Sequence, residues 1–142
     1  MKRVVLVAGL LGLGVAAAWA QGNVIEQRQA IMKSFGGQVR TVSGMLRGQA
    51  PFDLAQVQTA LNTFVDGSQK APPLFPPGSD AGDSKALPAV WEKKAEFDGL
   101  FVQFANDSKA ALASIKDEAS FKAAMPKVLE NCGTCHKTFR KS

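Results

Sequence analysis

Apolar residues recur along most of this chain at alternating steps of three and four, which is the spacing of one face of an α-helix. In residues 23–47 the repeat falls on Arg28, Met32, Phe35, Val39, Val42 and Leu46. A second run, with Asp53 as its expected N-cap, falls on Leu54, Val57, Leu61, Phe64 and Ser68. These runs predict two amphipathic helices, separated by a break at residues 48–51.

Two further helical runs follow in the second half of the chain. The third falls on Val90, Lys94, Phe97, Phe101 and Phe104 and continues to Ile115. The fourth, from about Ser120, falls on Phe121, Met125, Val128, Cys132, Cys135 and Phe139. Pro126 is expected to kink this last helix or to mark where its regular hydrogen bonding begins. Four such segments predict an all-α protein, an antiparallel four-helix bundle.

Residues 70–88 separate the two halves and contain five prolines and two glycines. A continuous helix is excluded there because proline lacks the backbone N–H that a helix interior requires. Stretches of this length without regular structure are uncommon in compact domains. We therefore expect a long crossover that links two helical hairpins.

The N-terminus has the features of a cleaved secretory signal peptide. Lys2 and Arg3 precede an uncharged apolar run over residues 4–17, and Ala18, Trp19 and Ala20 give the small-x-small pattern of a cleavage site. The run is shorter than the roughly 20 residues that span a bilayer, so we expect no membrane span after cleavage. Residues 1–20 are thus the expected signal peptide, and residues 21–142 (142 − 20 = 122 residues) form one exported domain.

The charge of the mature chain is only mildly basic. Without Lys2 and Arg3, 17 − 2 = 15 basic side chains face 12 acidic ones, a net charge near +3. These charges are spread along the chain, so we expect no nucleic-acid partner. A small surplus of lysine can still steer docking to an acidic protein.

The candidate chemistry lies near the C-terminus, in the sequence C-G-T-C-H. Cys132, Cys135 and His136 are the only cysteines and the only histidine of the chain. This pattern is the signature of c-type haem attachment, in which two thiols add to the haem vinyl groups and the imidazole binds the iron. On a helix these positions share one face, so the haem is expected on the C-terminal helix.

Three other interpretations of these residues remain open. A structural zinc site needs four protein ligands, and only three Cys or His residues are present. A thioredoxin-like C-x-x-C needs a βαβ context, whereas this motif follows a helical pattern. A Cys132–Cys135 disulfide in an exported helical bundle without haem is also possible, although it leaves His136 without a role.

The late C-x-x-C-H followed by Phe139 and Arg140, on a four-helix pattern, resembles the class II c-type cytochromes, the cytochrome c-prime family. Further matching stretches are Arg28-Gln29, residues 48–53, and Val90-Trp91 followed by Phe97. The resemblance spans essentially the whole mature chain. It implies a bacterial periplasmic protein with one haem c per chain, linked to Cys132 and Cys135, and frequently a homodimer built through the first two helices.

By the same resemblance, the residue on the far side of the iron is Met32, counted back from residues 48–51. High-spin members carry an apolar non-ligand there, whereas low-spin members carry a methionine that completes the coordination. His136 and Met32 are therefore the expected axial ligands. A methionine on a core-facing stripe can equally be a packing residue. Met45 and Met125 are expected in the core.

Two arginines have two interpretations each, and Trp91 has one. By the family pattern Arg28 pairs with a haem propionate; otherwise it is a solvated surface residue. Arg140 covers the proximal side of the haem or only solubilises the tail with Lys137 and Lys141. Trp91 is expected to pack in the core.

Coordination by both His136 and Met32 implies a periplasmic carrier that passes single electrons between redox partner proteins, since a thioether ligand raises the haem potential. We expect no enzyme, because the chain has no other histidine and no paired acid/base constellation. The alternative is a five-coordinate haem protein that binds nitric oxide or carbon monoxide for scavenging or sensing.

Overall fold

The computed structural model describes residues 11–142. Within this range the chain forms five α-helices and one 3₁₀ turn. Their bounds are α1 (Leu11–Leu46), α2 (Leu54–Lys70), η1 (Pro72–Leu74), α3 (Ala89–Glu92), α4 (Lys94–Ser114) and α5 (Glu118–Phe139). In the described part of the chain the only β pairing is an isolated bridge between Ala86 and Arg140.

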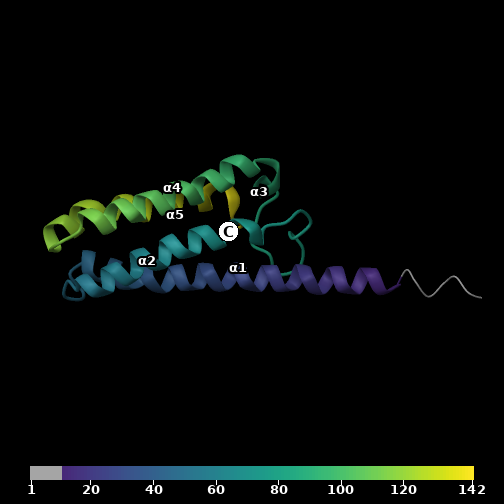
Figure 1. Cartoon of the computed structure of the whole chain (residues 1–142), viewed down its shortest axis with the longest axis horizontal. Helices are drawn as coiled ribbons and strands as arrows, with labels where there is room; N and C mark the ends of the chain where they lie inside the picture. The colour runs from purple at the N-terminus through teal and green to yellow at the C-terminus, as the bar shows by residue number, and fades with distance from the viewer. Residues whose placement is uncertain (1–10) are drawn as a thin grey trace, which may run out of the picture.

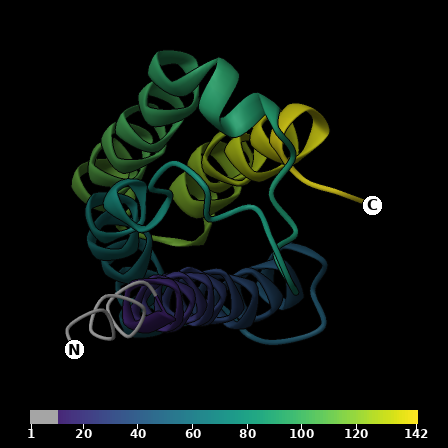
Figure 2. The same ribbon diagram turned by 90° about the vertical axis from the view of Figure 1, so that its right-hand side faces the viewer.

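The long helices form an antiparallel four-helix bundle, which confirms the predicted fold (Figure 1). Successive long helices run in opposite directions, with α1 and α2 on one side and α4 and α5 on the other. The view along the bundle shows the crossover from α2 passing over one end toward α3 (Figure 2). The close helix pairs are α2 with α4, α4 with α5, and α1 with α2.

Capping residues end or begin several helices close to the predicted positions. Gly48, at φ 69°, ends α1, and the Gln49 N–H donates to the Gly44 carbonyl at 2.9 Å. The Asp53 carboxylate caps α2 by accepting from the Gln56 N–H at 3.0 Å, as predicted. At the start of α5, Asp117 and Ser120 form a reciprocal capping box, so this helix begins two residues earlier than expected.

One expectation for the second half of the chain is wrong, and one of the two alternatives for Pro126 is excluded. The third segment is not one helix, because the backbone leaves the helical region at Lys93 (φ −119°, ψ 45°) and divides it into α3 and α4. Pro126 does not mark the start of regular hydrogen bonding, since α5 begins at Glu118 and continues through it. The Lys94 ammonium pairs with the Asp98 carboxylate rather than entering the core.

The bundle has two apolar clusters. One fills the middle and the loop end, and it contains the predicted core methionines Met45 and Met125. The other lies at the opposite end, beneath the crossover, and consists of Ala71, Phe75, Ala86, Val90, Phe97, Phe101 and Phe139. Half-buried Ile31 and Met32 of α1 pack against both clusters.

The predicted signal peptide falls partly outside the described residues, which begin at residue 11. The first turns of α1 extend beyond the other helices, and cleavage after Ala20 would remove them (Figure 1). Among the helices of residues 11–142, none combines the length and apolar character that a membrane crossing requires.

Candidate functional site

Cys132, Cys135 and His136 lie within the last turns of α5. Their spacing brings the three side chains to one face of the helix. Both thiols are free and half-buried, while the imidazole is more exposed. The helix is continuous across the motif, so its backbone sets the spacing of the three side chains.

A cavity of about 580 Å³ opens beside this face of α5. Small-molecule and cofactor sites commonly have volumes of about 300–1,000 Å³. The apolar part of its wall is largely aromatic, with Phe35, Phe75, Phe97, Phe101, Phe104 and Phe139. Cys132, Cys135 and His136 line it from α5, and Met32 and Val39 line it from α1. An aromatic cavity with two thiols and an imidazole on one wall fits a covalently attached haem.

The structure brings Met32 and His136 to the same cavity from two different helices. Helices α1 and α5 are not one of the closely packed helix pairs of the described chain, and the cavity lies between them. Met45 and Met125 are buried in the central cluster and do not line the cavity. Of the methionines described, Met32 alone faces this space.

The two thiols are poor nucleophiles in the folded chain. Burial raises the pKa of Cys132, and burial with the neighbouring Cys132 raises the pKa of Cys135 to about 11. Both therefore stay protonated at neutral pH, whereas redox-active C-x-x-C motifs depend on a lowered thiol pKa. Within residues 11–142, no group of three or more His, Cys, Asp or Glu side chains is arranged to hold a metal ion.

The His136 imidazole must be neutral to bind a metal, so a lowered pKa favours binding. Burial lowers the pKa of His136, and the positive charge of Arg140 lowers it further. The neutral form is therefore favoured at pH 7. Arg140 also lines the cavity.

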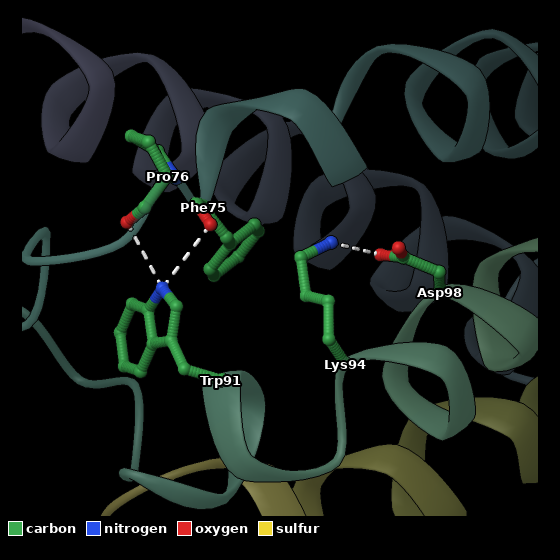
Figure 3. A network of polar contacts seen from close by, with 5 residues as sticks. All are labelled: Phe75, Pro76, Trp91, Lys94 and Asp98. Carbon is green, nitrogen blue, oxygen red and sulfur yellow. Dashed lines mark hydrogen bonds and ion pairs between the residues drawn. The ribbon is translucent and has the colours of Figure 1, made fainter.

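Arg28 is not a solvated surface residue, since only 4% of it is exposed. Its guanidinium donates to residues of the crossover, and it also lies on the cavity wall. Trp91 packs against the second apolar cluster as predicted, and in addition its indole N–H donates to the carbonyls of Phe75 (3.1 Å) and Pro76 (2.9 Å), as Figure 3 shows.

Sequence reasoning missed the cavity residues that the crossover supplies. Phe75, Lys85 and Ala86 line the cavity although no helical pattern includes them. The one available signal was the position of Leu74-Phe75, a pair of large apolar residues between two double prolines. Asn131, directly before Cys132, was also missed; it is buried and lines the cavity.

Asn131 connects the cavity wall to a charged pair formed by Asp107 of α4 and Lys127 of α5. Its amide donates to the Asp107 carboxylate at 3.0 Å, and the other carboxylate oxygen pairs with Lys127 at 3.2 Å. The hydrogen bond from Asn131, helped by Lys127, holds the pKa of Asp107 below its ordinary value of 3.8 despite partial burial. A lowered folded-state pKa stabilises the fold above the unfolded pKa and ceases to do so as pH falls through the folded value.

Asp107→Asn is expected to lower the free energy of unfolding by about 1 kcal/mol at neutral pH, the difference between a charge-assisted and a neutral hydrogen bond. Urea titrations of both proteins should show this difference near pH 7 and its disappearance as the pH falls below 3.8, the ordinary value for aspartate. Asp98→Asn is the matched control, because the Asp98 side chain is 41% exposed against 14% for Asp107, and its pair with Lys94 contributes little. A difference that persists unchanged in acid would contradict this role for the Asp107 charge.

Comparison with known proteins agrees with this site. Residues 23–140 match the protein family described as Cytochrome C'. Cytochrome c' of Rhodopseudomonas palustris is 48% identical over 139 residues, which cover 97% of this chain and 95% of that protein. Cytochrome c-556 of the same organism is 36% identical over 145 residues, covering 99% and 97%. The structure of cytochrome c' from Rhodopseudomonas palustris matches with a TM-score of 0.82 over 84% of this chain and 96% of that chain.

Proposed function

Because this chain belongs to the cytochrome c' family of class II c-type cytochromes and carries haem c on the two cysteines of α5, we propose that it is a periplasmic carrier of single electrons. The bound haem supplies an iron that takes up and releases one electron. The proposal assigns His136 and Met32 as axial ligands. In this function the chain exchanges electrons with redox partner proteins in the periplasm, and none of its residues is assigned a catalytic role.

The observation that carries the proposal is the placement of Met32 and His136 on one cavity from separate helices. His136 is fixed by α5, and its lowered pKa favours the neutral form that coordinates. Met32 is half-buried and packs against both apolar clusters. These contacts restrict the flexible side chain and hold its thioether in place. Two ligands fixed by the fold can remain bound in both oxidation states, which suits electron transfer.

Export to the periplasm follows from the N-terminal features and has support from the family match. The match begins at residue 23, just after the proposed cleavage site at Ala20. The segment before it is the proposed signal peptide, and residues 21–142 are the proposed mature domain.

A homodimer through α1 and α2 is part of the same proposal. Apart from the backbone of α1 itself, a Cβ placed at Gly37 or Gly44 would meet no atom within 4 Å, so close packing within the chain does not explain these glycines. A second chain lying close to α1 would explain them, because the absence of a side chain permits close helix approach.

The axial assignment is tested by Met32→Leu, which removes the sulfur and keeps the apolar volume. We expect the methionine-to-ferric-iron band in the near infrared to disappear, and carbon monoxide to bind the reduced protein at least about tenfold faster, equivalent to about 1.4 kcal/mol. The measurements are visible and near-infrared absorption and stopped-flow mixing with the gas. Met45→Leu is the control and should leave both unchanged, since Met45 lies in the central core.

The second candidate function is gas binding, favoured by the 48% identity to a protein named cytochrome c'. In that case Met32 is only a packing residue of the cavity wall. The wild-type protein would then show a high-spin spectrum, bind carbon monoxide at once, and be indifferent to Met32→Leu. That set of results would replace the electron-carrier proposal.

A further inference from the structure

The guanidinium of Arg28 is committed to the crossover between α2 and α3. One of its nitrogens donates to the Leu74 carbonyl at 3.1 Å and to the Ser79 hydroxyl at 2.8 Å. The other donates to the Ser79 carbonyl at 2.6 Å and to the Ser84 hydroxyl at 2.7 Å. Ser79 and Ser84 are themselves buried, at 0% and 3% exposure. A buried arginine is stable only when its donors are satisfied in this way.

The segment held by Arg28 forms one wall of the cavity. The guanidinium lies 4.5 Å from the centre of the Phe75 ring, and that ring lines the cavity and packs edge-on against Phe97. Lys85 and Ala86, which follow Ser84, line it too. Arg28 therefore determines where a whole section of the wall lies, and not only the space beside its own side chain.

Three other anchors hold the same segment. Next to Arg28 on α1, the exposed Gln29 amide donates to the Asp83 carbonyl at 3.1 Å. The Trp91 indole fixes the carbonyls of Phe75 and Pro76 from α3 (Figure 3). At the other end the Lys141 N–H donates to the Lys85 carbonyl at 2.8 Å, and its ammonium donates to the Ser84 carbonyl at 3.1 Å. Arg28 is the anchor between them, and it stands one turn before Met32 on α1. It thus connects the proposed ligand helix directly to the crossover.

We infer that Arg28 is a positioning residue that holds residues 74–86 closed over the cavity and so limits the access of external ligands and water to the side occupied by Met32. The inference rests on the proposed function for its kinetic consequence. Arg28 can hold the crossover because buried carbonyl and hydroxyl groups of this segment accept hydrogen bonds from the guanidinium. The Ser79 hydroxyl also donates to the Pro76 carbonyl, and the Ser84 hydroxyl also accepts from the Ala86 N–H. The carbonyls of Leu74 and Ser79 instead lose their donor without the guanidinium, and water can replace it only if the segment opens.

Two variants test the inference from opposite ends of the same hydrogen bonds. Arg28→Lys keeps the positive charge but loses the planar fork of donors, and the double variant Ser79→Ala with Ser84→Ala keeps Arg28 but removes both hydroxyls. In the reduced holoprotein each should bind carbon monoxide about tenfold faster than the wild type, a rate ratio equivalent to about 1.4 kcal/mol. Each should also lower the reduction potential, because solvent access to the cavity favours the oxidised state. Arg40→Lys, on an exposed part of α1, is the control and should change neither.

A third variant, Arg28→Gln, separates positioning from a direct electrostatic effect on the haem. If Arg28 acts only through its charge, Arg28→Gln alters the potential while Arg28→Lys and the serine double variant match the wild type. That outcome overturns the inference.

Hydrogen–deuterium exchange of the backbone amides in residues 74–86 makes the test independent of Met32. The amides of this segment should exchange about tenfold faster in Arg28→Lys and in the serine double variant, with the amides of α2 unchanged as the internal reference. If Met32 is not a ligand, Met32→Leu shows it and this exchange difference remains. Unchanged exchange in both variants would overturn the inference whatever Met32 does.

Discussion

Replacement of both Cys132 and Cys135 by serine should abolish covalent haem attachment completely. The thiols lie on the cavity wall and are the only cysteines of the chain, so no other residue can form the thioethers. Haem should then be released from the denatured protein by acid and organic solvent, whereas the wild type retains it. The apo-protein should also unfold at lower denaturant concentration, because a ligand bound only to the folded state stabilises it by mass action.

Gly133→Ala is the matched control for the cysteine variant. It changes the same motif, and an added Cβ meets nothing within 4 Å, so this protein should keep its haem. The single variants should each retain one thioether and remain pigmented after extraction. Haem that stays with the denatured double variant would show that attachment does not depend on these thiols, and it would remove the central assignment.

Gly67→Ala should destabilise the bundle by about 1–3 kcal/mol, the usual cost of overpacking a well-filled core. A Cβ at Gly67 of α2 would lie 2.3 and 2.5 Å from two ring carbons of Phe35 and 3.1 Å from a methyl of Ile31. Both neighbours belong to α1, so α1 and α2 approach each other closely at Gly67. Phe35 also packs edge-on against Phe64 and Phe104 and lines the cavity, so a displaced ring disturbs the site as well.

The sign of this effect is checked against Gly99→Ala on α4. No atom lies within 4 Å of a Cβ there, so alanine should stabilise the helix by up to about 1 kcal/mol through its higher helix propensity. Chemical unfolding of the two variants should therefore move in opposite directions. Phe35→Leu in the Gly67→Ala background should recover part of the loss, since it removes the clashing ring carbons. Stabilisation by Gly67→Ala would mean that the α1–α2 contact is looser than the structure shows.

The helical framework was predictable because it depends on local rules. Periodic apolar positions, Gly48 after α1 and Asp53 before α2 act within a few residues of one another, and the structure follows them. The break at Lys93 was not predictable in this way. The apolar spacing continues from Val90 to Phe97 across it, and the backbone departs from the helix where Trp91 reaches across to the crossover.

The fold class and the attachment motif followed from local sequence alone, because residues at i, i+3 and i+4 share one face of any helix. The sequence also indicated Met32, but only through the family resemblance, since periodicity cannot tell a ligand from a packing residue. The tertiary structure decided which residues share the cavity. Arg28 meets Ser79 and Ser84 across more than 50 positions of sequence, and no local pattern encodes such a contact. The role of Arg28 follows from its burial in the folded chain, because a buried charge is stable only when it is hydrogen-bonded.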